Sequence, residues 1–333
     1  MKKLLFNSLL FTCCGVLISS THGQVVMTGK GLPEAVAKVS FSDIVAYDVL
    51  FPVKSGKGRR IENAIRQFPE MPVDMNKIVF SEPARDKSEV LILDEPSPLP
   101  EVDFHGLEDS GNSIPPDVNG AVGPDHLMIT LNTQIRIMDR AGTPISTVST
   151  GSFWHPLPGS GGVFDPKIYY DPYENRWILA MPSFVNPNIS RVMVAVSETS
   201  DPTGNWFMYT FDGNPTDQLW FDYPNYGFNS KWLVVSGNMV DAQPVYAALY
   251  IFNIKHLYEF NPGAEFTRYE VYDGFSLIPS ATFDEDEEDI YIVDNTNGNL
   301  NGSGYIHLRK VTGELSDPQL VDIGYIEVPD PWE

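Results

Sequence analysis

The stretch of the chain that decides the fold runs from residue 165 to residue 211. It opens with DPKIYYD (165–171), passes a polar turn to RWILA (176–180), and continues with RVMVAVS (191–197) and WFMYTF (206–211). Each run is short and rich in β-branched and aromatic residues, and Gly, Pro, Asn or Asp separates the runs. This pattern predicts four consecutive antiparallel strands.

The same order of runs returns along the chain at a period of roughly fifty to sixty residues, which is in the range of propeller blades. Further units start at Asp222, at Ile278 and, in a shorter form, near Asp117. Outside the first stretch, the strand-like runs are 127–131, 135–138, 232–236, 248–252, 290–293, 305–308 and 323–328. Four strands per unit is typical of propeller blades, so we predict an all-β fold, a β-propeller-like array of about four antiparallel blades within 114–333.

The N-terminus reads as a leader for export. Lys2 and Lys3 precede an apolar run over 4–18 and a small, polar stretch that ends at Gly23. This is the pattern of a signal peptide (1–23), and the apolar run is too short for a permanent membrane span. Both cysteines, Cys13 and Cys14, lie in this leader, so the mature chain has no disulfide. We expect a secreted or cell-surface protein, and the sequence leaves lipid attachment and free secretion open.

Two segments separate the leader from the repeats. The first, 24–93, has weak periodicity and no clear fold, and the second, 94–113, carries DEPSPLP (94–100) and predicts an extended linker. Four blades seldom close into a ring, and repeat arrays need capping. The array is therefore either the front part of a longer protein, or 24–93 supplies missing strands.

The chain is strongly acidic, with a formal net charge of −22. A field of this sign repels phosphate backbones and anionic lipid surfaces, which argues against nucleic acid and membrane-surface partners. No two histidines stand three or four residues apart, and neither a Gly-x-Ser-x-Gly elbow nor a P-loop occurs. A local zinc site, a serine-hydrolase nucleophile and nucleotide binding are therefore not supported.

Several motifs resemble a known group of proteins. They are FHGL (104–107), PPDVNGAVGPDH (115–126), the hairpin DRAG (139–142), DP (165–166), RW (176–177) and DYP (222–224). From about Phe104 onward the chain resembles uncharacterised exported bacterial β-propeller-like proteins, whose longer members often carry a C-terminal secretion-sorting domain. The resemblance implies a propeller fold and export, and no activity.

A second, weaker resemblance is to the aspartate-box hairpins of sialidase-type propellers. The stretch SDPTGNW (200–206) has the serine next to the aspartate and a shortened end, so it departs from the Ser-x-Asp-x-Gly-x-x-Trp pattern. In that family the box is structural. We therefore expect Asp201 and Gly204 to shape a turn and Trp206 to pack between blades.

Three carboxylates form the main candidate site. Asp117, Asp165 and Asp222 each stand before the first strand of a unit, so they would face one another at one mouth of the channel, together with Asp125 and Asp171. Such a ring can bind Ca²⁺ through oxygen ligands, or hold the acid and base of glycosidic bond chemistry. The alternative is that these aspartates cap turns at the strand starts.

The candidate ligand-binding residues are Trp154, Trp220 and His126. Both tryptophans lie on connections between strands, where a ring can stack on a sugar, and His126 lies on a loop where it can act in acid–base chemistry. The tryptophans at strand starts, Trp177, Trp206 and Trp232, are expected in the core between blades.

Three functions stay open from the sequence. The first is an exported or cell-surface propeller that binds protein or glycan, with calcium as a stabilising ion. The second is a glycan-acting hydrolase that uses Asp117, Asp165 and Asp222, and the third is a structural or adhesin segment of a larger secreted protein. Whether the protein is an enzyme is undecided at this stage.

Overall fold

The computed structural model describes residues 25–52, 75–81, 99–108, 113–186, 189–213, 219–240, 245–295, 299–300 and 303–328. The predicted signal peptide (1–23), its cleavage position near Gly23 and both cysteines lie outside the described residues. Part of the predicted linker (94–113) does so too. Within the described residues, no helix is both long and apolar enough to cross a membrane.

The prediction of an all-β, propeller-like array is confirmed: the chain forms four sheets of mainly antiparallel strands. Blade 1 consists of β4 (Asn119–Val122), β5 (His126–Thr130), β6 (Gln134–Asp139) and β7 (Pro144–Ser149). Blade 2 consists of β8 (Lys167–Asp171), β9 (Arg176–Asn186), β10 (Ile189–Ser197) and β11 (Asn205–Asp212).

The two later blades follow the same order. Blade 3 consists of β12 (Trp220–Phe228), β13 (Trp232–Val240), β14 (Tyr246–Asn253) and β15 (Phe266–Val271). Blade 4 consists of β16 (Ile278–Pro279), β17 (Ile290–Asp294), β19 (Ser303–Glu314) and β20 (Asp317–Val328), with β18 (Asn299–Leu300) paired to β19. In every blade the strands are neighbours in chain order, as hairpin turns require.

The N-terminal region supplies outer strands to three of these blades. Strand β1 (Val25–Gly31) pairs with β15, and β2 (Ala35–Ser40) pairs with β11, both antiparallel. Strand β3 (Ile78–Ser81), which follows a 3₁₀ turn at Met75–Lys77, pairs with β20 in parallel. These strands widen existing blades, and none of them forms a further blade.

Three short helices cover blade edges: α1 (Phe41–Leu50), α2 (Thr150–Trp154) and α3 (Ile254–Tyr258). The side chain of Ser40 caps α1 by accepting from the Asp43 N–H, and that of Ser149 caps α2 in the same way. The Ser149 hydroxyl also donates to Asp48 at 2.8 Å, which ties α1 to blade 1.

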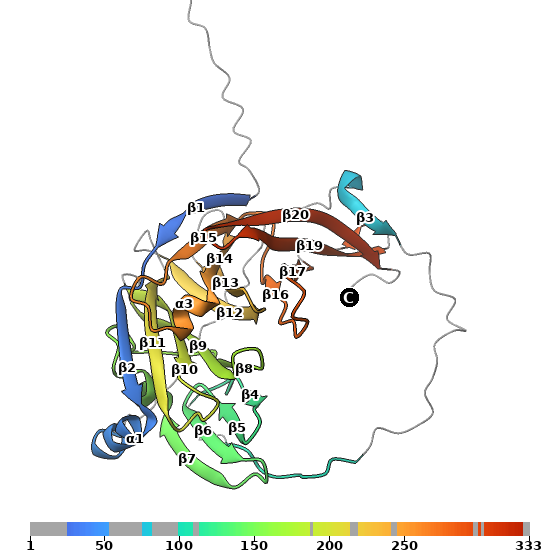
Figure 1. The fold of residues 1–333 in the computed structure, drawn as a ribbon. Coiled ribbons are helices and arrows are strands. Elements are labelled where there is room, and N and C mark those ends of the chain that lie inside the picture. Colours follow the sequence, from blue (N-terminus) through green and yellow to red (C-terminus); the bar gives the residue numbers. More distant parts are fainter. Residues whose placement is uncertain are drawn as a thin grey trace, which may run out of the picture.

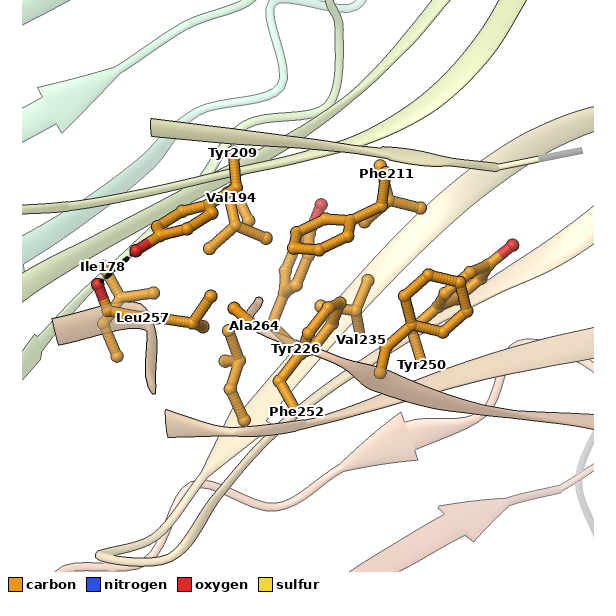
Figure 2. Packing of buried hydrophobic residues seen from close by; sticks show 14 of the residues in the cluster. Ile178, Val194, Tyr209, Phe211, Tyr226, Val235, Tyr250, Phe252, Leu257 and Ala264 are labelled. Carbon is orange, nitrogen blue, oxygen red and sulfur yellow. Dashed lines mark hydrogen bonds between the residues drawn. The ribbon is translucent and has the colours of Figure 1, made fainter. Parts of the chain in front are cut away.

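The core lies between the blades. On β9, Ile178 and Ala180 pack toward blade 3, whereas Trp177 and Leu179 pack toward blade 1. Figure 2 shows the cluster between blades 2 and 3, in which Val194 faces side chains of the next sheet. Alternate residues of a strand point to opposite faces of its sheet. Both faces of a middle blade are therefore apolar, and the two neighbouring blades bury them.

The blades stand side by side in an open arc, with β4, β8, β12 and β16 on its inner side (Figure 1). Within the described residues, no strand of blade 4 packs extensively against a strand of blade 1. The outer face of blade 1 is covered by the segment 104–107, where the Phe104 ring lies against Gly142 and the Gly106 carbonyl accepts from Arg136 at 2.6 Å. One end of the arc is thus capped by the chain itself.

The strand-like runs of the sequence fall on observed strands, with ends that differ by a few residues. Trp177, Trp206 and Trp232 are fully buried, as expected. The stretch 200–206 forms the expected structural turn, in which the Asp201 carboxylate accepts from the Thr203 N–H at 2.9 Å and the Trp206 indole donates to the Pro202 carbonyl at 2.9 Å.

The inner strands of blades 3 and 4 approach too closely for a side chain at Gly227. A Cβ at Gly227 would lie 2.2 Å from the carbonyl oxygen of Ser280. We predict that Gly227→Ala lowers the free energy of unfolding by about 1–3 kcal/mol, because the backbones must separate. The control Gly161→Ala, whose Cβ would meet only Val185 at 3.4 Å, is expected to stay within about 0.5 kcal/mol of wild type. Urea unfolding followed by tryptophan fluorescence measures both, and equal losses would contradict the prediction.

Candidate functional site

Four equivalent residues stand at the starts of the inner strands. Asp117, Asp165, Tyr223 and Ser276 have φ values of 49°, 45°, 52° and 52°. Each lies two residues before the position where the inner strand pairs, or resumes pairing, with the second strand of its blade. We call these four the strand-start residues. All four inner strands begin at the same end of the blades, and we call this end the mouth.

Asn132 ties two strand-start residues together across blades 1 and 2. Its side-chain amide donates to the Asp117 carboxylate and to the Pro115 carbonyl, and its oxygen accepts from the Asp165 backbone N–H at 2.7 Å. Between blades 3 and 4, Asn238 bonds to the strand-start residue of the next blade, because its oxygen accepts from the Ser276 N–H at 2.8 Å and its amide donates to the Ser276 hydroxyl at 3.1 Å. By the pairing register, Asn132 and Asn238 occupy equivalent positions.

Asp165 is held as a neutral acid at neutral pH. Partial burial of its carboxyl, the charge of Asp117, a hydrogen bond with the Asp117 carboxylate and the charge of Asp222 together raise the pKa of Asp165 to about 8, against a smaller opposing effect of Lys167. Asp117 and Asp165 therefore form a carboxyl pair in which Asp165 keeps its proton, since two like charges in contact cannot both ionise freely. Of the predicted trio, Asp117 therefore contacts Asp165, and Asp222 acts on Asp165 through its charge.

A buried hydroxyl lies beside this pair. Tyr226 on β12 is 3% exposed, and its hydroxyl has no hydrogen-bond partner among the described residues. Burial raises the pKa of Tyr226 well above its ordinary value, and the nearby charge of Asp165 raises it further. A buried, unpaired hydroxyl is costly, and this one lies in the core between blades 2 and 3, out of reach of a ligand at the mouth.

The other predicted residues lie in three different settings. Trp154 is fully buried, with its indole nitrogen 3.1 Å from the Met181 sulfur, so its ring has no free face for a sugar. Trp220 is half-buried between the rings of Phe164 and Phe184, at centroid distances of 5.9 and 5.3 Å. Since Phe164 immediately precedes Asp165, Trp220 is the predicted aromatic nearer the mouth.

His126 and two acidic residues belong to the opposite end of the blades. His126 begins β5, and its Nε2 lies 3.9 Å from the Asp201 carboxylate. Asp171 ends β8, six residues after Asp165, and accepts from the Tyr258 hydroxyl at 2.6 Å. Asp125 lies in the exposed turn before β5. The sequence grouped Asp125 and Asp171 with the mouth, but the inner strands carry them away from it.

A group with metal-ligand character is present in blade 4. Among the described residues, Asp273, His307 and Asp322 are the one set of three such side chains whose ligand atoms all lie within 4.8 Å of one another, and the predicted trio at the mouth is not such a set. In this structure Arg309 donates to Asp273 at 3.0 Å and to His307 Nδ1 at 2.7 Å. A cation would have to displace this guanidinium, since the site already holds a positive charge.

The neighbouring contacts complete this network. His307 Nε2 lies 2.9 Å from Asp322, and Lys77 donates to Asp322 at 2.6 Å. Burial raises the pKa of Asp322, but the hydrogen bonds from His307 and Lys77 outweigh burial and hold it well below the usual range. Because Arg309 only donates, His307 Nδ1 accepts, and Nε2 carries the proton toward Asp322. The network serves as an internal ion pair that joins β3 to blade 4.

The sequence repeat predicted that Asp222 is the counterpart of Asp165 in blade 3. In the structure, the counterpart of Asp165 is Tyr223. Asp222 lies one residue earlier and pairs with Asn238 on β13. The prolines mark the correct alignment of the two blades, because Pro166 follows Asp165 and Pro224 follows Tyr223. A repeat alignment anchored on the prolines, which restrict the residue before them, would have found Tyr223.

Comparisons with known proteins add little to this description. No protein-family profile matches the chain, and no curated protein matches it in sequence. Two similar solved structures are exo-β-1,3-galactanases, from Clostridium thermocellum (10% identity, TM-score 0.37, 66% of this chain and 51% of that chain) and Phanerochaete chrysosporium (9%, 0.36, 66% and 53%).

A third similar structure is a subtype N11 neuraminidase-like protein of an H18N11 strain from a flat-faced bat (12% identity, TM-score 0.34, 64% of this chain and 56% of that chain). The chain thus spans about half the length of each of these proteins. Similarities this low support no conclusion about activity, and the propeller-like fold rests on the four sheets themselves.

The proton that Asp165 keeps predicts a pH effect on stability. Because the folded-state pKa of Asp165, about 8, lies above its ordinary value of 3.8, the folded protein binds more protons than the unfolded chain between these values. The free energy of unfolding therefore falls as the pH rises through this window. We expect Asp165→Asn, which cannot ionise, to gain roughly 1–3 kcal/mol relative to wild type between about pH 5 and pH 9.

Urea unfolding at several pH values measures this difference, and Asp125→Asn at the exposed opposite end serves as the control. Parallel pH profiles for wild type and Asp165→Asn would show that Asp165 is ionised in the folded protein at neutral pH.

Proposed function

We propose that the protein is an exported or cell-surface glycan-binding propeller whose ligand binds at the mouth, against Asp117, Asp165 and Asp222. The observation that carries the proposal is the carboxyl pair of Asp117 and Asp165 at the mouth, in which Asp165 keeps its proton. With its proton engaged between the two carboxyl groups, such a pair offers acceptor oxygens to sugar hydroxyls, and charge-assisted hydrogen bonds are the stronger ones. The half-buried ring of Trp220 adds apolar surface near these groups.

Export rests on the leader pattern of residues 1–23 and on the loss of both cysteines with it. The strong negative charge of the chain fits a ligand without phosphate or sulfate groups. These arguments support a glycan as the partner over a nucleic acid or a membrane surface. A protein ligand, the other partner left open by the sequence, is an outcome of the test below.

A glycan-acting hydrolase is the second candidate, and the raised pKa of Asp165 favours it. A carboxyl that keeps its proton at neutral pH can act as a general acid. However, glycosidases separate their two carboxyl groups by about 5 Å or more, and Asp117 contacts Asp165 directly. In a hydrolase, the pair would therefore act as one unit and Asp222 would supply the opposing carboxylate.

Binding can be tested with soluble polysaccharides in affinity electrophoresis. We expect wild type to be retarded by at least one neutral polysaccharide. Asp165→Ala and Asp222→Ala should each weaken binding by about tenfold, the value of one lost hydrogen bond, while Asp125→Ala should bind like wild type. Release of reducing ends by wild type, lost in both mouth variants, would establish the hydrolase instead. No retardation in any polysaccharide would exclude a glycan-binding role and leave a protein ligand.

Calcium binding by Asp117, Asp165 and Asp222 is the associated prediction. A cation at the mouth has to displace the proton of Asp165, so Ca²⁺ affinity should rise with pH up to about 8. Calorimetry in buffers of different ionisation enthalpy should show proton release on binding by wild type and none by Asp165→Asn. A calcium effect that survives in Asp165→Asn but disappears in Asp322→Asn would assign the ion to the blade 4 group. No heat at about 10 mM Ca²⁺ would exclude calcium altogether.

A further inference from the structure

Tyr223 occupies at the start of blade 3 the position that Asp117 and Asp165 occupy in blades 1 and 2. Its φ of 52° matches their values, and pairing of β12 with β13 resumes two residues later, at Asn225. The direction in which a side chain leaves the backbone follows from the backbone conformation. The Tyr223 ring therefore leaves the chain at the mouth, which is the end of the blades where the carboxyl pair also lies.

This tyrosine is exposed in a conformation that does not suit it. A bulky residue at positive φ is a true outlier, and such strain persists where the surroundings impose it. Tyr223 is 56% exposed, and among the described residues its hydroxyl makes no hydrogen bond. The buried Pro224 and the bulge between Asp222 and Asn225 hold the backbone in place. Neither burial nor bonding of the side chain within this fold explains why a tyrosine stands there.

We propose that Tyr223 is the stacking platform of the mouth and that it selects an uncharged sugar ring; this inference rests on the proposed glycan-binding function. An exposed aromatic ring at the same end of the blades as the carboxyl pair offers an apolar face for the C–H side of a sugar, while carboxyl groups bind sugar hydroxyls. The carboxylates of Asp117 and Asp222 repel uronic acids and sulfated sugars, so neutral glycans are the expected class.

A stacking role and a structural role of Tyr223 can be distinguished by replacing the residue with glycine. A stacking role predicts lower affinity with no loss of stability, and a structural role predicts a loss of stability. Tyr223→Gly relieves the positive φ, so its melting temperature should equal or exceed that of wild type. The same variant loses the ring, so its affinity for a neutral polysaccharide should fall by about tenfold or more. Tyr223→Phe keeps the ring and should bind within about threefold of wild type. Tyr223→Asn tolerates positive φ without a ring and should behave as Tyr223→Gly does.

Asn175→Gly is the matched control, because it changes a residue with a similar φ of 54° and no ring in the turn between β8 and β9, at the opposite end of the blades. It should leave the affinity unchanged. Binding is measured by affinity electrophoresis against one neutral polysaccharide and one polyuronic acid. If Tyr223→Gly binds as tightly as wild type while Asp165→Ala binds weakly, the platform is wrong and the glycan site stands. If wild type prefers the polyuronic acid, the neutral ligand class is wrong. If wild type binds neither, both proposals fall.

Discussion

Burial of both faces of the middle blades is the constraint on which the rest of the structure depends. Every described position of β13 is buried, and β9 sends apolar side chains to both neighbouring blades. A sheet of this kind has no solvent face, so each blade has to be covered by another layer. Stacking of successive blades meets this need, and β1, β2 and the segment 104–107 extend the covering beyond the repeats.

The chemistry of the mouth is a consequence of this stacking. Because blade 1 lies against blade 2, Asp117 at the start of β4 meets its counterpart Asp165 at the start of β8, and Asn132 bonds to both. Partial burial and the like charge of the neighbour then keep a proton on Asp165. Neither aspartate would hold a proton at neutral pH as an isolated turn residue.

The strands of blades 2 and 3 were predictable from the sequence because dense apolar and β-branched runs alternate with turn residues there. Strands β1 and β2 were not, because they carry glycine, lysine and half-exposed side chains, and their only partners are distant in sequence. At the site, Asp117 and Asp165 could be predicted from their positions before strands. Trp154 could not be recognised as a core residue, since the burial of a connection depends on the blades around it.

The sequence by itself determined the all-β repeat, the acidic charge and the candidate carboxylates, because these follow from local pattern and composition. Only the tertiary structure decided that Tyr223 and not Asp222 shares the backbone position of Asp165, that Asp171 lies at the other end of β8, and that Asp165 keeps its proton. The physical reason is that a bulge shifts the strand by residues that no pattern marks, and a pKa depends on charges brought close by packing between blades.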